Sequence, residues 1–290
     1  MIWVPLSIVA AVTVAAMALL SEYQKHPTVA RLFWLRFCSL AALMPVALFI
    51  EWPSNPQFYL CMVALSVLIC GSDALYYGSA KDHGAGVTTR IEPLSVLMTF
   101  VAWCALTPSQ IDAYAAKPLV AAGIALCFAA AGYFALRLRH CDVSFAVMKK
   151  LAPVIVIMAA VSILGKTAMD AGGKPFDAAV AYIVIQCALM LLFYGGASVV
   201  TPQFTGNLKP NRALLASAAI MAVCSVTHIA TKNIAYTYVP NPAYVTVIGL
   251  TAPLFVAGFY HLAGRADDTD KVAGFGIVIT SIILVVLTRF

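Results

Sequence analysis

The chain has 290 residues, of which 62% are hydrophobic and only 10% are charged, and its mean hydropathy is +0.93. A water-soluble globule of this length cannot bury so large an apolar fraction, so the composition excludes a soluble protein and predicts an integral membrane protein. The net charge of +6 identifies no partner, because basic residues also set membrane orientation and contact anionic lipid headgroups.

Apolar runs bounded by proline, glycine, asparagine and charged residues predict ten membrane-spanning helices. Roughly 20 apolar residues are needed to cross a hydrocarbon layer of about 30 Å. The first run lacks the basic start and small-residue end of a cleaved signal peptide, so we expect it to remain as a spanning helix. The connections are too short for folded domains, which predicts an all-α polytopic membrane protein. The expected spans are residues 2–20, 30–50, 58–80, 84–106, 118–138, 143–165, 178–200, 213–238, 242–262 and 270–288.

Two segments about 160 residues apart share one pattern, a small-residue turn followed by a helix with a proline near its start. They read LYYGSAKDHGAGVTTRIEPLSVLMTFVAWCAL, with Pro93, and YTYVPNPAYVTVIGLTAPLFVAGFYHLAG, with Pro253. The two copies predict two similar halves, residues 1–140 and 141–290. Because each half would hold five spans, an odd number, the second half would enter the membrane upside down as an inverted repeat.

Lysine and arginine near helix ends favour the cytoplasm, whereas acidic residues contribute little to that choice. Most of them fall in the connections after odd-numbered spans, from Lys25 near the N-terminus to Arg265 near the C-terminus. The charge count therefore predicts that both termini lie outside the cell.

Ionisable residues inside predicted spans are costly to bury, so they mark a pathway or a pair. Residues three or four apart share a helix face, which places a polar cluster on one side of the third span and another on one side of the eighth. We expect these clusters to bind the substrate. The candidate residues are Asp73, Tyr76, Tyr77, His228, Lys232, Asn233 and Tyr236.

The offset between the two repeated segments places Asp73 opposite Asn233 and Ser72 opposite Lys232. The two clusters would approach a common midplane near the pseudo-twofold axis, where inverted-repeat transporters bind substrate. One hypothesis is that Asp73 and Lys232 form, or alternately break, an ion pair lining a central cavity. The competing interpretation is that each side chain extends to its own membrane interface or satisfies a neighbouring helix.

Three further cations, Arg90, Lys149 and Lys150, lie toward the side of the odd-numbered connections. Arginine suits bidentate recognition of a carboxylate or phosphate, and lysine adds a less directional charge, so these residues are candidates for attracting an anionic substrate. The alternative interpretation is that these three cations only set the orientation of the chain in the membrane. Glu92 is a further substrate-binding candidate, and it is also able to neutralise Arg90 locally.

Prolines in membrane helices free a carbonyl one turn earlier, so Pro93 and Pro253 are candidate hinges, although tolerated prolines are equally compatible with the pattern. The cysteines are scattered singly, and no HExxH, GxSxG or P-loop motif is present. We therefore expect no catalytic residues, no metal site, no cofactor and no enzyme activity.

The ordered combination of ten short-looped spans and two turn–helix–proline hairpins resembles the EamA-like branch of the drug/metabolite transporter superfamily. The resemblance covers the whole chain in architecture but only the two quoted segments in motif. It implies a secondary transporter that moves small organic solutes through a central cavity by alternating access. It also implies that both termini are cytoplasmic, opposite to the charge count, while Arg90 and Glu92 are more polar than is usual for the family at that point.

The main functional expectation is a transporter of a small anionic or zwitterionic metabolite in a bacterial inner membrane, with coupling to protons through Asp73, Glu92 or His228 as a further hypothesis. An alternative is a flippase for a phospholipid or lipid-linked sugar, whose phosphate Arg90, Lys149 and Lys150 would hold. An intramembrane enzyme or a receptor is a third class. The expected partners are a small solute or a lipid headgroup and the surrounding lipids, with no nucleic acid.

Overall fold

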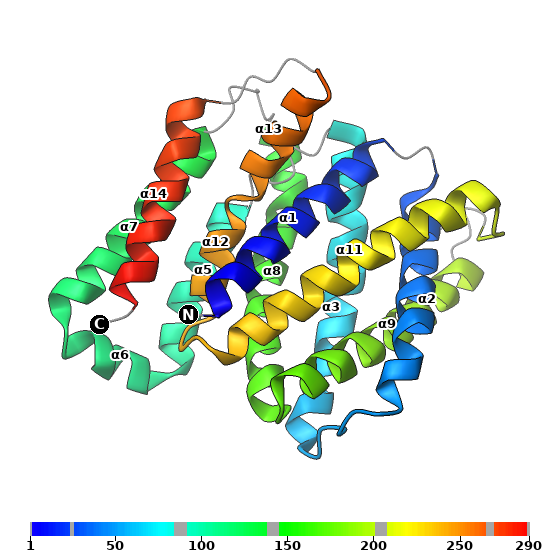
Figure 1. Cartoon of the computed structure of the whole chain (residues 1–290), viewed down its shortest axis with the longest axis horizontal. Helices are drawn as coiled ribbons and strands as arrows, with labels where there is room; N and C mark the ends of the chain where they lie inside the picture. The colour runs from blue at the N-terminus through cyan, green and yellow to red at the C-terminus, as the bar shows by residue number, and fades with distance from the viewer. Residues whose placement is uncertain are drawn as a thin grey trace.

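The computed structural model of the chain describes residues 2–23, 26–83, 92–137, 145–200, 208–264 and 270–288. Within these ranges the protein is entirely helical and contains no strand (Figure 1). The helices are α1 (Trp3–Glu22), α2 (Thr28–Ala47), α3 (Pro56–His83), α5 (Glu92–Leu106), α6 (Pro108–Ala115), α7 (Pro118–Arg137), α8 (Phe145–Ala171), α9 (Pro175–Val200), α11 (Arg212–Thr237), α12 (Ala243–Gly249), α13 (Ala252–Leu262) and α14 (Lys271–Leu287).

Local sequence explains where many helices begin. Helices α3, α6, α7 and α9 each start with a proline, whose fixed φ suits the first helical position and whose missing N–H would have no partner there. The side chain of Asn211 accepts a hydrogen bond from the backbone N–H of Leu214 at 2.8 Å and so caps α11. Asp270 caps α14 in the same way, through the N–H groups of Val272 and Ala273.

Seven helical segments in the described part of the chain are long and apolar enough to cross a membrane, which makes this a multi-pass membrane protein. One of the seven, Ala243–Leu262, combines α12 and α13. Shorter apolar helices occupy Ser95–Leu106 and Val272–Leu287, and α6 meets α7 at a bend of 113°. Each expected span overlaps a helix or a helix pair, whereas α6 falls in a connection where the sequence predicted no helix.

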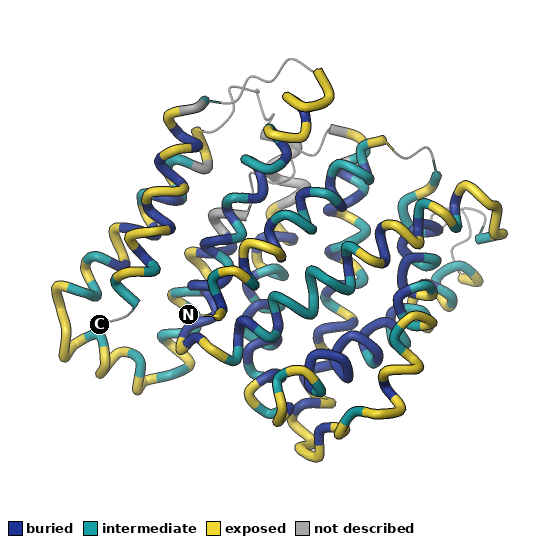
Figure 2. The backbone as a smooth tube through the Cα atoms, in the orientation of Figure 1, coloured by how far each residue is buried: buried dark blue, intermediate teal, exposed yellow. Residues whose placement is uncertain are grey.

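The helices pack in pairs that are distant in sequence (Figure 1). Helix α1 packs along α11, α3 along α8, α2 along α9, and α7 along α14. Buried residues concentrate toward the middle of the bundle, and exposed residues follow the outward faces of the helices (Figure 2). Many of the exposed side chains are large and apolar, such as Phe49, Leu119 and Val199. Such faces match a hydrocarbon surrounding and would be unusual in contact with water.

The segment around Pro253 is broken. Helix α12 ends at Gly249 and α13 begins at Ala252, so the proline lies in the first turn of a new helix. Because proline has no N–H to continue the bonding of the preceding helix, it favours the start of α13. Pro93 lies in the first turn of α5. Their roles as hinges stay predictions.

Contacts near the end of α5 join it to distant segments. The indole N–H of Trp103 donates to the carbonyl oxygen of Pro240 at 2.9 Å. The hydroxyls of Tyr114 on α6 and Tyr244 on α12 lie 2.7 Å apart. The short helix α6, which has no buried residue, is therefore joined to the start of α12, and α5 is joined to the turn before it.

Close packing of α7 on α14 depends on Gly276. A Cβ at this position would lie 2.5–2.6 Å from ring atoms of Phe134 on α7, too close for any real contact. We predict that Gly276→Ala lowers the free energy of unfolding by about 1–3 kcal/mol, because the ring has to shift in a packed interface. The thermal unfolding midpoint of the purified protein in detergent measures the effect.

Gly132→Ala is the matched control, since Gly132 lies on α7 and a Cβ at this position would have no neighbouring atom within 4 Å. Equal midpoints for the two variants would contradict the predicted clash.

Candidate functional site

A cavity of about 170 Å³ lies among the central helices, with walls from α1, α2, α3, α5, α8, α9, α11 and α12. Its apolar walls include Val14, Met17, Val154 and Met158. Every candidate residue of the third and eighth expected spans lines it: Asp73, Tyr76, Tyr77, His228, Lys232, Asn233 and Tyr236. The structure thus brings together two polar clusters that are far apart in the sequence.

The cavity-lining residues of α3 and α11 occupy corresponding positions of the two repeated segments, which lie about 160 residues apart in the sequence. On α3 the cavity is lined by Ile69, Ser72, Asp73 and Tyr76, and on α11 it is lined at the same spacing by Ile229, Lys232, Asn233 and Tyr236. The two helices therefore turn corresponding faces toward one space.

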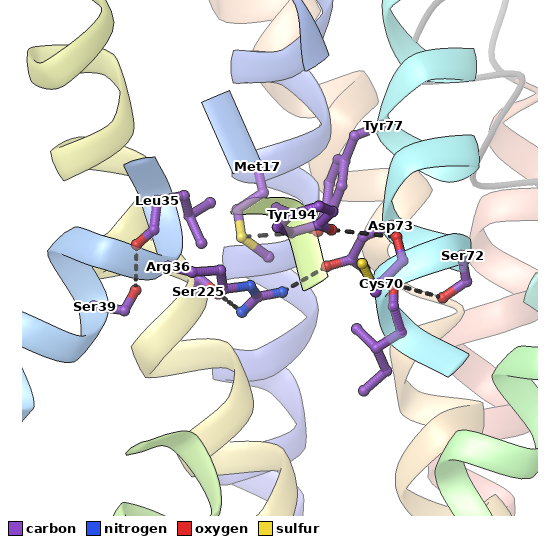
Figure 3. Close-up of polar contacts among 11 residues, drawn as sticks. Met17, Leu35, Arg36, Ser39, Cys70, Ser72, Asp73, Tyr77, Tyr194 and Ser225 are labelled. Atoms are coloured by element: carbon purple, nitrogen blue, oxygen red, sulfur yellow. Dashed lines mark hydrogen bonds and ion pairs between the residues drawn. The ribbon is translucent and has the colours of Figure 1, made fainter. Parts of the chain in front are cut away.

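Asp73 pairs with Arg36 of α2 (Figure 3). The Arg36 Nη2 atom lies 2.5 Å from Asp73 Oδ2, and Nη1 donates to the hydroxyl of Ser225 on α11 at 3.3 Å. The side chains are only 5% and 18% exposed. In this conformation the Asp73 carboxylate pairs with Arg36 and not with Lys232, and the hypothesis of an Asp73–Lys232 pair that alternately forms and breaks stays a prediction. Arg36 was missed, although it lies inside an expected span, where the rule on costly charges identifies it.

On α11, His228 and Lys232 make different contacts. His228 Nδ1 lies 2.9 Å from the carbonyl oxygen of Ala10 and donates to it, which connects α11 to α1. The Lys232 ammonium lies 5.8 Å from the centre of the Tyr236 ring, within reach of a cation–π attraction. Among the described residues Lys232 has no ion pair. It is therefore a cavity-lining cation with no carboxylate assigned to it.

Three buried polar atoms on the same side of the cavity have no hydrogen-bond partner. They are Gln186 Oε1, Asn233 Nδ2 and the hydroxyl of Tyr236. A Cβ on Gly165 of α8 would lie 3.4 Å from the Tyr236 ring and 3.8 Å from Asn233 Oδ1, so the glycine leaves room beside both side chains. Gln186 was not predicted, because an uncharged amide within a span is not marked by the rule on ionisable residues.

The remaining predicted residues lie at the edge of what the structure describes. Arg90 lies outside the described residues. Glu92 belongs to α5, and Lys149 and Lys150 belong to α8, but their side chains are outside the described part. The predicted anion-attracting cluster thus stays a prediction. Within the described ranges, no group of three or more His, Cys, Asp or Glu side chains could hold a metal ion.

Comparison with protein-family models and with curated proteins finds no match for this chain. Eight chains of solved structures match. One is described only as "Crystal structure of protein"; it has a TM-score of 0.69 and 13% sequence identity, and the match covers 99% of this chain and 98% of that chain. At this identity, the likeness shows a shared fold over the full length.

The pairing of Arg36 with Asp73 leads to a stability prediction. Asp73→Asn leaves a buried guanidinium without its carboxylate, and we expect the free energy of unfolding to fall by about 3–5 kcal/mol. Arg36→Met combined with Asp73→Leu should recover most of that loss, because it removes both charges together. Thermal unfolding in detergent compares the variants.

The control is Glu51→Gln, which breaks the 2.6 Å pair between Glu51 and Lys174 at positions where both side chains are mostly exposed. Solvent screens that pair, so its loss should leave the midpoint nearly unchanged. Similar unfolding midpoints for Asp73→Asn and Glu51→Gln would show that the Arg36–Asp73 pair contributes no more to the free energy of unfolding than an exposed pair does.

Proposed function

We propose that this protein is a secondary transporter that moves a small anionic or zwitterionic organic metabolite through the central cavity by alternating access. The observation that supports the proposal best is the placement of Lys232, a cation with no carboxylate partner among the described residues, on the wall of a cavity inside a membrane bundle. Ionisable groups kept in such places generally serve a pathway or a ligand.

The helix contacts support an inverted repeat of five spans in each half, with halves at residues 1–140 and 141–290. Under this proposal α1, α2, α3, α5 and α7 correspond in order to α8, α9, α11, α12–α13 and α14. Exchanging each helix for its counterpart converts the α1–α11 contact into α8–α3, and the α2–α11 contact into α9–α3. The α2–α9 and α7–α14 contacts map onto themselves. A pseudo-twofold axis between the halves explains this pattern.

The placement of the termini supports an even number of crossings. Ile2 and Trp3 line one surface pocket together with Thr288. The N-terminal end of α1 and the C-terminal end of α14 therefore lie at the same face of the bundle. Ten spans satisfy this requirement, with α5 and α14 as the short ones. We propose that the chain is a ten-span member of the drug/metabolite transporter superfamily in a bacterial inner membrane.

Alternating access requires contacts between the halves that exchange as the cavity opens. Two such contacts border the cavity. Arg36 of the first proposed half donates to Ser225 of the second, and His228 of the second donates to Ala10 of the first. Both are single hydrogen bonds, each worth about 1–3 kcal/mol at most, so they are suited to breaking during a transport cycle.

Binding to purified protein tests the proposal. Any ligand present at about 100 times its dissociation constant should stabilise the folded state by roughly 2.7 kcal/mol, so thermal unfolding against a panel of organic anions, amino acids, phosphorylated sugars and lipid headgroups will identify it. For an anion identified in this way, we predict that Lys232→Gln weakens binding at least tenfold and reduces its flux into proteoliposomes accordingly.

Lys174→Gln is the control, because it removes an exposed lysine far from the cavity wall. An unchanged affinity in Lys232→Gln would count against the proposed site. Stabilisation by phospholipid or polyprenyl-phosphate headgroups alone would favour a flippase, and a chemically altered product without flux would favour an enzyme.

A further inference from the structure

The two sides of the cavity share a framework but differ in charge. On the α2–α3 side, Arg36 and Asp73 neutralise each other and Ser72 lies beside them. On the α9–α11 side, the residue at the position of Asp73 is Asn233, and the residue at the position of Ser72 is Lys232. One side thus contains an ion pair, in which Arg36 Nε has no hydrogen-bond partner, and the other contains an ammonium and neutral amides.

The α9–α11 side also has unused hydrogen-bonding capacity. Gln186, Asn233 and Tyr236 are each no more than 3% exposed, and each has a buried polar atom without a partner. An unsatisfied buried polar group is unfavourable, so a ligand that supplies partners gains affinity at these positions. Asn233 Nδ2 can donate, Gln186 Oε1 can accept, and the Tyr236 hydroxyl can do either.

These groups gather around one part of the cavity. The Lys232 ammonium lies 5.8 Å from the Tyr236 ring centre. Asn233 Oδ1 and the hydroxyl of Tyr182 both lie 3.8 Å from the position a Cβ on Gly165 would occupy. Gln186 follows Tyr182 by one turn on α9, so it presents its amide on the same helix face. The ammonium and the amides therefore line the same cavity, on neighbouring faces of α9 and α11.

The net charge of the residues that line the cavity limits the class of ligand that it can bind. The described residues that line the cavity include the cations Arg36 and Lys232 and the anion Asp73, together with His228, which donates to a backbone carbonyl. With His228 neutral, the described residues of the lining carry a surplus of one positive charge. A monoanion neutralises it, whereas the ammonium of an α-amino acid would bring a second cation close to Lys232 in a poorly solvated space.

Resting on the proposed transport function, we infer that the α9–α11 side is a recognition subsite for a 2-hydroxy carboxylate. Lys232 and Asn233 Nδ2 bind the carboxylate, and the neighbouring hydroxyl donates to Gln186 Oε1. The aliphatic part of the ligand lies against the apolar wall formed by Val14, Val154 and Met158. Arg36 does not bind the ligand in this scheme, because its guanidinium pairs with Asp73.

Four compounds of one size test the subsite: 2-hydroxy-4-methylpentanoate, 4-methylpentanoate, 2-hydroxy-4-methylpentanamide and leucine. They differ only in the hydroxyl, the charge or the added ammonium. Calorimetric titration of the full chain in lipid nanodiscs should show the hydroxy acid binding at least tenfold more tightly than each of the others. This comparison needs no variant, so it holds even if a substitution impairs folding.

Variants then assign the contacts. Gln186→Met keeps the length of the side chain but removes the acceptor, so it should abolish the preference for the hydroxy acid over the plain acid while keeping the preference over the amide. Lys232→Gln should abolish the preference for the acid over the amide. Lys174→Gln should change neither the preference for the hydroxy acid over the plain acid nor the preference for the acid over the amide.

Equal binding of the two acids by the wild-type protein, or tighter binding of leucine, would overturn the subsite. If none of the four binds but another organic anion is carried in a Lys232-dependent way, the subsite is wrong and transport stands. Absence of binding and of flux for every organic anion in the wider panel would reject both.

Discussion

The buried pairing of Arg36 with Asp73 is the constraint on which the centre of this bundle depends. Burying a guanidinium in an apolar interior is costly, and a carboxylate and further hydrogen bonds offset the loss of water. Here the carboxylate comes from α3 and an additional acceptor comes from Ser225 on α11, so one side chain connects three helices in this conformation. The same pairing removes Arg36 and Asp73 as free charges from the cavity, and Lys232 then lines the cavity as a cation without a carboxylate partner among the described residues.

The cavity follows from the way the long helices cross. Helix α3 packs against α8 and α9, and α11 packs against α1 and α2, so each contacts helices that are distant in the sequence. In this arrangement the C-terminal halves of α3 and α11, which carry the polar residues Asp73 and Asn233, line the same cavity. The outward faces can then be largely apolar at the lipid boundary, because the polar groups have a common interior space to face.

Much of this architecture could be predicted from the sequence, because hydrophobic length and proline position are strong local signals. The positions of the long helices and the meeting of Asp73 with Asn233 around one cavity follow from those signals. The partner of Asp73 did not, since the choice between Arg36 and Lys232 depends on helix packing that no periodicity reveals. Helix α6 was missed for a related reason: it is short and has no buried residue, so it leaves no apolar pattern. Gln186 and Tyr182 could not be predicted as cavity residues, because a neutral side chain indicates a site only when its burial is known.

The unequal chemistry of the two cavity walls has a consequence for how such a protein can diversify. The contacts that hold the bundle together at this level involve Arg36, Asp73 and Ser225, whereas Lys232 and Gln186 Oε1 make no hydrogen bond or ion pair within the described chain. Substitutions at Lys232 or Gln186 therefore alter the charge and shape presented to a solute at little cost to folding. If the proposed transport function holds, the scaffold and the selectivity of the cavity can change independently over evolutionary time, because the residues that join the helices differ from those proposed to contact the solute.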